Sequence, residues 1–153
     1  GEKVVPMGAI AYAFSEEGAG IDGKSFSLLP VEIFYRETGK TKKVTEYPCD
    51  GKLLKAAEQV KTKYHTGRGV IGSGDEWNNQ LDRIALLRER YHTAVEDMES
   101  AAAAQLCLSY GVPFLGVRIL SNSIVNGEKF DEAVGIDGQK FMLSLVDQMR
   151  EYM

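Results

Sequence analysis

The chain has 153 residues, of which 44% are hydrophobic and 26% are charged. These proportions are typical of a single globular domain, and we expect one domain over residues 1–153. The net charge of −4 argues against an extended nucleic-acid surface, because such surfaces are basic. No apolar run approaches the roughly 20 residues that a membrane-spanning helix needs. We therefore expect no nucleic acid or membrane partner, and a cytoplasmic location.

The first third of the chain is predicted to be rich in strands. Residues 4–14 are largely apolar and lead into a glycine-rich, acidic loop over residues 15–23. Residues 31–35 and 43–47 flank a turn that contains Gly39. Two short runs on either side of a turn glycine predict a hairpin.

Helices and strands are predicted to alternate from residue 51 onward. Asp50 is a favourable N-cap for a helix over residues 51–64, whose apolar side chains recur at helical spacing. Residues 69–74 have the pattern of a short buried strand that ends in glycines. The next predicted helix covers residues 80–90, with Asn78 or Asn79 as its cap.

The second half of the chain continues this alternation. A short strand is predicted over residues 93–95, and an alanine-rich helix over residues 98–110, closed by Gly111. Residues 114–120 form a nearly continuous apolar run, as expected of a central parallel strand. Residues 133–153 predict a final amphipathic helix. The alternation implies parallel α/β units, but only about four core strands are evident, which is few for a sheet covered on both faces.

Two charged residues stand out against this apolar background. Glu99 lies at the start of the alanine-rich helix, and Arg118 lies within the apolar run that follows. Burying either charge without a partner is unfavourable, so each is expected to meet a counter-ion or a ligand. Together they predict a ligand site at one edge of a parallel sheet. His65 and His92 are too few and too poorly placed for a metal site, and we expect surface positions for both.

Three short motifs, in order, resemble those of a known superfamily. They are Ser73-Gly74-Asp75, Met98-Glu99, and Arg118-Ile119-Leu120-Ser121-Asn122. The chain resembles the purine nucleoside phosphorylase and nucleosidase superfamily, and within it the methylthioadenosine/S-adenosylhomocysteine nucleosidases. The resemblance implies a three-layer α/β/α fold with a mixed, mostly parallel central sheet.

The resemblance extends over nearly the whole chain, but it corresponds only to the larger, C-terminal part of a typical family member. The N-terminal part of the family domain, with its water-activating carboxylate, has no counterpart in this sequence. We therefore expect the chain to be a fragment, or to pair with a separate N-terminal piece.

The resemblance implies a role in sugar binding for Glu99. The matching glutamate accepts hydrogen bonds from the ribose 2′ and 3′ hydroxyls, and its charge favours a developing oxocarbenium ion. The alternative is a carboxylate that only complements the helix dipole. Arg118 would hold Glu99 ionised and oriented through an ion pair, or would form a purely structural buried pair.

Five further positions carry roles that the resemblance implies. Trp77 would stack on the purine, and the Asn78 backbone would recognise the base edge. Met98 would pack near the ribose, and Phe130 would border the 5′ substituent. Tyr12 would reach across a homodimer interface into the neighbouring pocket. Structural roles remain open as alternatives, in particular a buried structural position for Trp77 and a core position for Met98.

Asn122 departs from the nucleosidase pattern. The nucleosidases have an aspartate here, which donates a proton to purine N7 as the base leaves. An asparagine amide can donate a hydrogen bond to N7 but cannot deliver a proton, and loss of a general acid costs about 10²–10⁴-fold in rate. Some phosphorylases for 6-oxopurines have asparagine at this position. Asp131 or water could supply the proton instead.

The expected function is hydrolysis of the N-glycosidic bond of a purine nucleoside, of the methylthioadenosine or S-adenosylhomocysteine type, in methionine salvage. Glu99 and Asn122 are the candidate catalytic residues, and no cofactor or metal is expected. One alternative is a phosphate-dependent purine nucleoside phosphorylase. The other is a non-catalytic relative that stores or senses its ligand.

Overall fold

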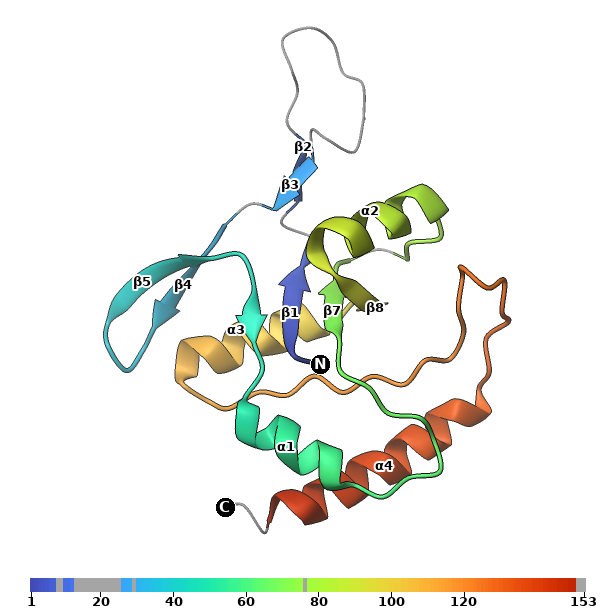
Figure 1. The fold of residues 1–153 in the computed structure, drawn as a ribbon. Helices are drawn as coiled ribbons and strands as arrows, with labels where there is room; N and C mark the ends of the chain where they lie inside the picture. Colours follow the sequence, from blue (N-terminus) through green and yellow to red (C-terminus); the bar gives the residue numbers. More distant parts are fainter. Residues whose placement is uncertain (8–9, 13–25, 29, 76, 151–153) are drawn as a thin grey trace, which may run out of the picture.

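The centre of the molecule is a four-stranded mixed sheet (Figure 1). The computed structural model describes residues 1–7, 10–12, 26–28, 30–75 and 77–150. The sheet has the order β6-β1-β7-β8 and consists of β1 (Lys3–Pro6), β6 (Tyr47–Pro48), β7 (Val70–Ser73) and β8 (Thr93–Asp97). Strand β1 is parallel to β7, β7 is parallel to β8, and β6 is antiparallel to β1. The sheet is thus mixed and mostly parallel, as predicted.

Two antiparallel ribbons accompany this sheet. One pairs β2 (Ile10–Tyr12) with β3 (Phe26–Leu28), and the other pairs β4 (Val31–Tyr35) with β5 (Lys40–Val44). The hairpin predicted around Gly39 is confirmed, and this glycine has φ +65°. Its second strand begins at Lys40 rather than at residue 43. The reason is a tight turn: Gly39 N donates to Tyr35 O at 2.9 Å, so Lys40 already pairs with Tyr35. The loop predicted over residues 15–23 lies outside the described residues.

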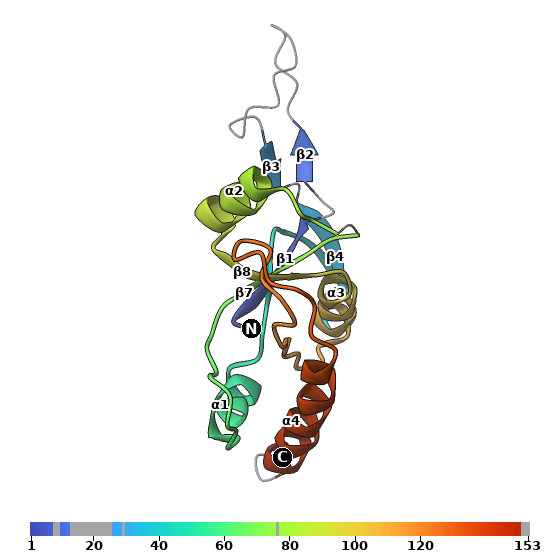
Figure 2. The ribbon, with the colours of Figure 1, turned by 90° about the vertical axis from the view of Figure 1, so that its right-hand side faces the viewer.

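Helices flank the sheet on both sides. They are α1 (Gly51–Gln59), α2 (Leu81–Tyr91), α3 (Ser100–Tyr110) and α4 (Ala133–Met149). Figure 2 shows α2 and α3 on opposite sides of the strands, which gives the predicted three layers. Helices α1 and α4 pack against each other beyond the end of the sheet where β7 begins (Figure 1). None of the described helices is long and apolar enough to cross a bilayer.

Local capping rules explain where α1 begins. The Asp50 carboxylate accepts hydrogen bonds from Lys52 N and Leu53 N at 2.8 and 2.9 Å, as the cap prediction requires. The helix ends at Gln59, five residues earlier than predicted, because Val60 adopts an extended conformation with φ −65° and ψ 118°. The residues that follow, including Tyr64, lie in a loop.

The predicted cap of α2 was wrong. Gln80 occupies the N-cap position and its side chain makes no capping hydrogen bond. The Asn78 side-chain oxygen instead accepts from Gln80 N at 3.3 Å, outside the helix. His92 ends α2 in the left-handed conformation, with φ 58°, and is exposed.

The last two helices follow the predicted pattern more closely. Gly111 ends α3 in the left-handed conformation, with φ +68°, where glycine carries no steric penalty. In the predicted amphipathic helix α4, Leu145 is buried and the neighbouring Val146 is exposed. Helix α4 ends at Met149, and residues 151–153 lie outside the described part of the chain.

The predicted central strand over residues 114–120 is not a strand in this structure. The segment runs between the sheet and α4 (Figure 1) and pairs with no strand that the structure describes. Two backbone bonds hold its first half: Asp50 N donates to Phe114 O at 2.7 Å, and Gly1 N to Gly116 O at 2.5 Å. A Cβ at Gly116 would lie 2.6 Å from Ile71 Cδ1, so the segment is placed by close packing rather than by a ladder.

The main hydrophobic core lies between the sheet, the hairpin β4–β5 and α3. Its buried residues are Val4, Ile33, Tyr47, Ile71 and Ala104. A second, smaller cluster joins Met7 and Leu87 beneath α2. Ile71 of β7 belongs to the main core and Val95 of β8 packs against it, so this core holds the two strands side by side.

Candidate functional site

The carboxyl ends of β7 and β8 bring together the residues of the candidate site. Ser73 and Asp97, the last residues of these strands, are partners in the parallel ladder. Gly74 N donates to Asp97 O at 3.0 Å, and α3 begins three residues after Asp97. In parallel α/β sheets, ligands bind at this carboxyl edge.

Asp97 is the best-coordinated carboxylate of this edge. Its side chain is only 7% exposed. One oxygen accepts from Ser100 N at 3.1 Å, and the other accepts from Ser100 Oγ at 2.5 Å and from Arg118 Nε in an ion pair. Arg118 Nη2 also donates to Ser100 Oγ at 2.7 Å. The carboxylate therefore has neutral and charged donors around it.

The pKa of the Asp97 carboxyl lies below its ordinary value of 3.8. Burial by itself raises this pKa, because it penalises the charged form. Hydrogen bonds from Ser100 and Ser73, together with the positive charge of Arg118, outweigh burial and lower the pKa. Asp97 is therefore an anion at neutral pH, paired with Arg118.

The same network fixes the start of α3. Asp97 accepts from Ser100 N, and Ser73 Oγ accepts from Ala101 N at 2.9 Å. Both N–H groups belong to the first turn, where helical partners are lacking. Ser73 and Ser100 are themselves 1% and 2% exposed. Side chains from the strand ends therefore anchor the helix on the sheet edge.

Glu99 lies immediately before this anchored helix. It occupies the N-cap position with φ −117° and ψ −28° and makes no side-chain capping bond. The side chain is exposed, and Oε2 accepts from Met98 N at 3.3 Å. A carboxylate beside a helix N-terminus is electrostatically favoured, and its lone pairs can accept from the hydroxyls of a ligand.

The predicted ion pair between Arg118 and Glu99 was wrong, because Arg118 pairs with Asp97. Arg118 is also not buried in a strand, since a third of its side chain is exposed. The reason is strand geometry: Asp97 ends β8 beside Ser100, whereas Glu99 lies beyond the strand on the exposed side of the turn. The Asp97-x-x-Ser100 spacing at a helix start was the sequence signal for this arrangement.

The loop after β7 lies at the same edge. Asn78 Nδ2 donates to Glu96 Oε1 at 3.3 Å, which ties the loop to β8. Trp77, directly before Asn78, is 64% exposed, and Met98 is also exposed. The structure thus places Trp77, Asn78, Met98 and Glu99 around the ends of two adjacent strands.

The remaining predicted site residues are less closely connected to this edge. Asn122 is half-buried, and its Oδ1 accepts from Ser121 Oγ at 3.1 Å. Asp131 N donates to Ser121 O at 3.0 Å, so Asp131 closes the loop that carries Asn122. Phe130 is exposed beside the start of α4. Tyr12 is on β2, but its side chain lies outside the described part of the structure.

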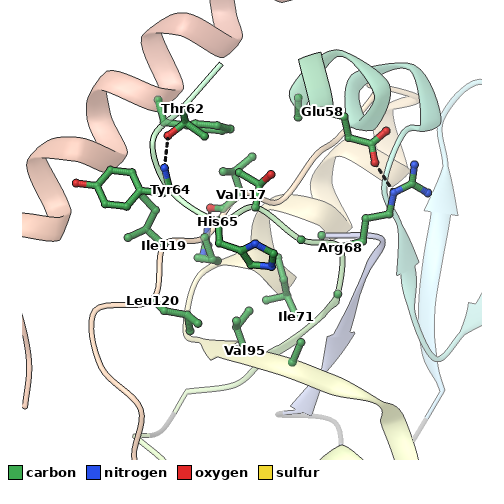
Figure 3. A pocket seen from close by; sticks show the side chains of 18 of the residues that line it. Glu58, Thr62, Tyr64, His65, Arg68, Ile71, Val95, Val117, Ile119 and Leu120 are labelled. Atoms are coloured by element: carbon green, nitrogen blue, oxygen red, sulfur yellow. Dashed lines mark hydrogen bonds and ion pairs between the residues drawn. The ribbon is translucent and has the colours of Figure 1, made fainter. Parts of the chain in front are cut away.

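A cavity of about 550 Å³ lies at the opposite end of the sheet, where β7 begins. Figure 3 shows the His65 imidazole among the apolar side chains of Ile71, Val95 and Val117. An ion pair between Arg68 and Glu58, at 2.5 Å, lies at its rim. The lining includes Arg118 but neither Trp77 nor Glu99.

A second cavity, of about 670 Å³, lies between residues 117–121 and α4 and is lined in part by Phe130. It too contains neither Trp77 nor Glu99. In the ranges that the structure describes, no three or more histidine, cysteine, aspartate or glutamate residues are grouped so that they could hold a metal ion. The candidate site thus consists of an exposed carboxylate, an exposed indole, and an ion pair between the buried carboxylate of Asp97 and the partly exposed Arg118.

Comparisons with known proteins give this arrangement a family. The sequence profile of the Phosphorylase superfamily matches residues 1–149, and the chain belongs to that superfamily. A 5′-methylthioadenosine/S-adenosylhomocysteine nucleosidase of Bacillus pumilus is 34% identical over 129 residues, which are 77% of this chain and 55% of the relative. The nucleosidase of the same description from Aeromonas salmonicida is 32% identical over 125 residues, which are 77% of this chain and 54% of the relative.

Solved structures confirm the fold. The Helicobacter pylori protein MTAN superimposes with a TM-score of 0.64 at 24% identity, over 96% of this chain and 58% of that one. The Helicobacter pylori futalosine hydrolase gives a TM-score of 0.64 at 22% identity, over 96% and 57%. The chain spans about half the length of the curated relatives it matches.

Proposed function

We propose that this chain carries the base- and ribose-binding part of an N-glycosidase that hydrolyses purine nucleosides of the methylthioadenosine or S-adenosylhomocysteine type. The observation that carries the proposal is the position of Glu99. Its exposed carboxylate is held at the start of α3 by a helix anchored through Ser73 and Asp97. The named relatives that act on these nucleosides share about a third of the matched residues with this chain.

Glu99 would bind the ribose hydroxyls during bond cleavage. An ionised carboxylate can accept hydrogen bonds from both the 2′ and the 3′ hydroxyl. As the bond between C1′ and the purine nitrogen breaks, its electron pair leaves with the base and positive charge develops on the ribose. A negative charge nearby stabilises that charge. Water then adds to C1′ and loses a proton.

The neighbouring residues would bind the remainder of the nucleoside. The Trp77 indole is exposed beside the same edge and offers a face on which a purine can stack. The Asn78 backbone would recognise the base edge, Met98 would pack on the ribose, and Phe130 would border the 5′ substituent. In this proposal Arg118 does not contact the nucleoside. It neutralises Asp97, and Asp97 anchors the helix that presents Glu99.

Asn122 favours a second candidate, a phosphate-dependent purine nucleoside phosphorylase. An amide at this position can bond purine N7 but cannot protonate it. A 6-oxopurine nucleoside, with phosphate as the nucleophile, is compatible with that amide. In the hydrolytic reaction, water or Asp131, whose backbone closes the Asn122 loop, would supply the proton.

The remaining proposals concern the assembly and its setting. We propose a cytoplasmic location, on the basis of the composition, and a role in methionine salvage, which the resemblance implies. The resemblance also suggests a homodimer in which Tyr12 reaches the neighbouring site. The molar mass of the protein, measured by size-exclusion chromatography with light scattering, tests the dimer. A monomer at micromolar concentration would contradict it.

The test of function uses the full chain and, in parallel, the chain co-expressed with the part of the Bacillus pumilus relative that lies outside the match. Each preparation is incubated with methylthioadenosine, S-adenosylhomocysteine or inosine, with and without phosphate, and free base is quantified. Release without phosphate supports the hydrolase, and release only with phosphate supports the phosphorylase. Trp77 is the only tryptophan, so its fluorescence reports nucleoside binding directly. Binding without release in both preparations would leave the non-catalytic relative as the better account.

A further inference from the structure

His65 is a polar residue that the proposed function does not use. It lies between α1 and β7, and Figure 3 shows its imidazole directed into the cavity of about 550 Å³ where β7 begins. We call this cavity the His65 cavity. In the ranges that the structure describes, the imidazole has no hydrogen-bond or ion-pair partner, although one ring nitrogen can donate and the other can accept. The ring is therefore available to a ligand.

The walls of the His65 cavity are mainly apolar. Apolar side chains come from α1, β7, β8, the segment of residues 115–120 and α4, and they include Leu54, Ile71, Val95, Val117 and Phe141. Ile71 is only 1% exposed, so the main hydrophobic core fixes this part of the wall. Cavities of this size, with apolar walls and a few polar groups, are the usual sites of small organic ligands.

The loop that carries His65 is held on both sides of this residue. Before it, the Tyr64 hydroxyl donates a hydrogen bond to Asp137 of α4. After it, Arg68 forms an ion pair with Glu58 of α1 at 2.5 Å. The imidazole is thus positioned without a ligand, while its side chain remains exposed to solvent, from which a ligand can enter. A preformed site of this kind reduces the entropic cost of binding.

The charged groups that line the cavity are already paired with other protein groups. The pairs are Glu58 with Arg68 at 2.5 Å, Asp137 with Lys63 at 3.7 Å, Arg118 with Asp97, and the Gly1 amino group with Gly116 O at 2.5 Å. A charged ligand would lose its hydration among the apolar walls without gaining a free counter-ion, which is unfavourable. The lining therefore favours an uncharged ligand, with the imidazole as its hydrogen-bonding partner.

We propose that the His65 cavity is a binding site for an uncharged aromatic molecule that carries one hydroxyl or ring N–H group. The aromatic body would pack against the apolar walls, and the hydroxyl or N–H group would donate a hydrogen bond to the His65 imidazole. The lining of this cavity contains neither Trp77 nor Glu99, so the site is separate from the candidate nucleoside site. The proposal requires no nucleosidase activity and is tested by binding alone.

The test uses the full chain and two matched probes. 2-Naphthol is uncharged at neutral pH and can donate one hydrogen bond, whereas 2-methoxynaphthalene has the same ring system without the donor. The chain has two histidines, so proton NMR shows two imidazole Cε1–H signals, which single substitutions assign. We expect 2-naphthol to shift the His65 signal saturably and to leave the His92 signal in place. 2-Methoxynaphthalene should bind about tenfold more weakly, because the hydrogen bond is lost.

Two variants locate the site, with affinities measured by the fluorescence of each probe. His65→Phe keeps an aromatic ring but cannot accept the hydrogen bond, so the preference for 2-naphthol should disappear. His92→Asn is the control and should leave both affinities unchanged. His92 is exposed, lies outside the cavity, and ends α2 in the left-handed conformation, which asparagine tolerates.

Three results would overturn the proposal even if the His65→Phe variant failed to fold, because they concern the unsubstituted chain. They are an unmoved His65 signal, equal affinities for 2-naphthol and 2-methoxynaphthalene, and tighter binding of naphthalene-2-sulfonate than of 2-naphthol. The last result would assign the cavity to an anion. A preference for 2-naphthol that persists in a folded His65→Phe variant would also overturn it, because the hydrogen bond would then belong to another residue.

Discussion

Asp97 and Arg118 form an ion pair that joins the end of β8 to the apolar segment of residues 114–120. Both partners also bond to Ser100, the first residue of α3: the Ser100 hydroxyl donates to Asp97 and accepts from Arg118 Nη2. The ion pair therefore connects the strand edge, the helix that presents Glu99, and the segment of residues 114–120. Perturbing this pair should affect all three.

Asp97→Asn should destabilise the fold. The substitution keeps an acceptor for Ser100 N but removes the negative charge that Arg118 requires. Because a third of the Arg118 side chain is exposed, water compensates part of the loss, and we expect about 1–3 kcal/mol of unfolding free energy, measured by urea denaturation. Asp147→Asn is the matched control, since Asp147 forms an exposed pair with Arg150. Equal effects of the two variants would contradict a special role for Asp97.

The same pair predicts a dependence of stability on pH. The pKa of Asp97 is lower in the folded state than its ordinary value of 3.8, so the folded state binds fewer protons than the unfolded state near that pH. Its contribution is complete above about pH 5 and is lost as the pH falls through 3.8 toward the folded pKa. Unfolding free energies of the parent and Asp97→Asn should therefore converge in acid. A constant difference from pH 7 to pH 3 would be inconsistent with this pair.

Much of the fold followed from local rules in the sequence. Asp50 caps α1, Gly39 makes the hairpin turn and Gly111 ends α3, each as predicted. These features depend on a few neighbouring residues and on backbone conformations that few residue types favour. The position of Glu99 at a helix start was predictable for the same reason.

The misplaced features depend on contacts that are distant in the sequence. Asp97 and Glu99 are two residues apart, and only the end of β8 decides which carboxylate meets Arg118. Whether residues 114–120 join a ladder depends on the presence of a neighbouring strand, which the segment's own composition does not determine.

Ser73→Ala should loosen the start of α3. The hydroxyl accepts from Ala101 N at 2.9 Å and donates to Asp97, and the side chain is buried. Losing a buried helix cap costs about 1–2 kcal/mol, and faster amide exchange at Ala101 should accompany the loss. Ser144→Ala is the control, because Ser144 bonds Lys140 O on the exposed side of α4. Unaltered exchange at Ala101 would show that the cap is dispensable.

Gly116→Ala should be poorly tolerated. The added Cβ would lie 2.6 Å from Ile71 Cδ1, and Ile71 is fully buried. Overpacking of this kind costs about 1–3 kcal/mol, which thermal or urea unfolding would detect. Adding Ile71→Val removes the colliding methyl group and should recover part of the loss as a coupling energy. Gly135→Ala is the control, since nothing lies within 4 Å of a Cβ there. Additive effects at Gly116 and Ile71 would contradict the close approach.

Glu99→Gln should separate catalysis from folding. The side chain is exposed and accepts a weak hydrogen bond from Met98 N at 3.3 Å. A glutamine oxygen can accept the same bond, so the unfolding midpoint should stay within error. Turnover of methylthioadenosine should fall by at least about 100-fold, because the charge that stabilises the developing oxocarbenium ion is lost. Glu132→Gln is the matched control: Glu132 is also an exposed N-cap residue without a side-chain capping bond. Rates are compared in the co-expressed preparation, where Trp77 fluorescence reports affinity independently. Full activity of Glu99→Gln would remove the ribose assignment, and equal losses in both variants would trace the effect to general helix electrostatics rather than to the sugar.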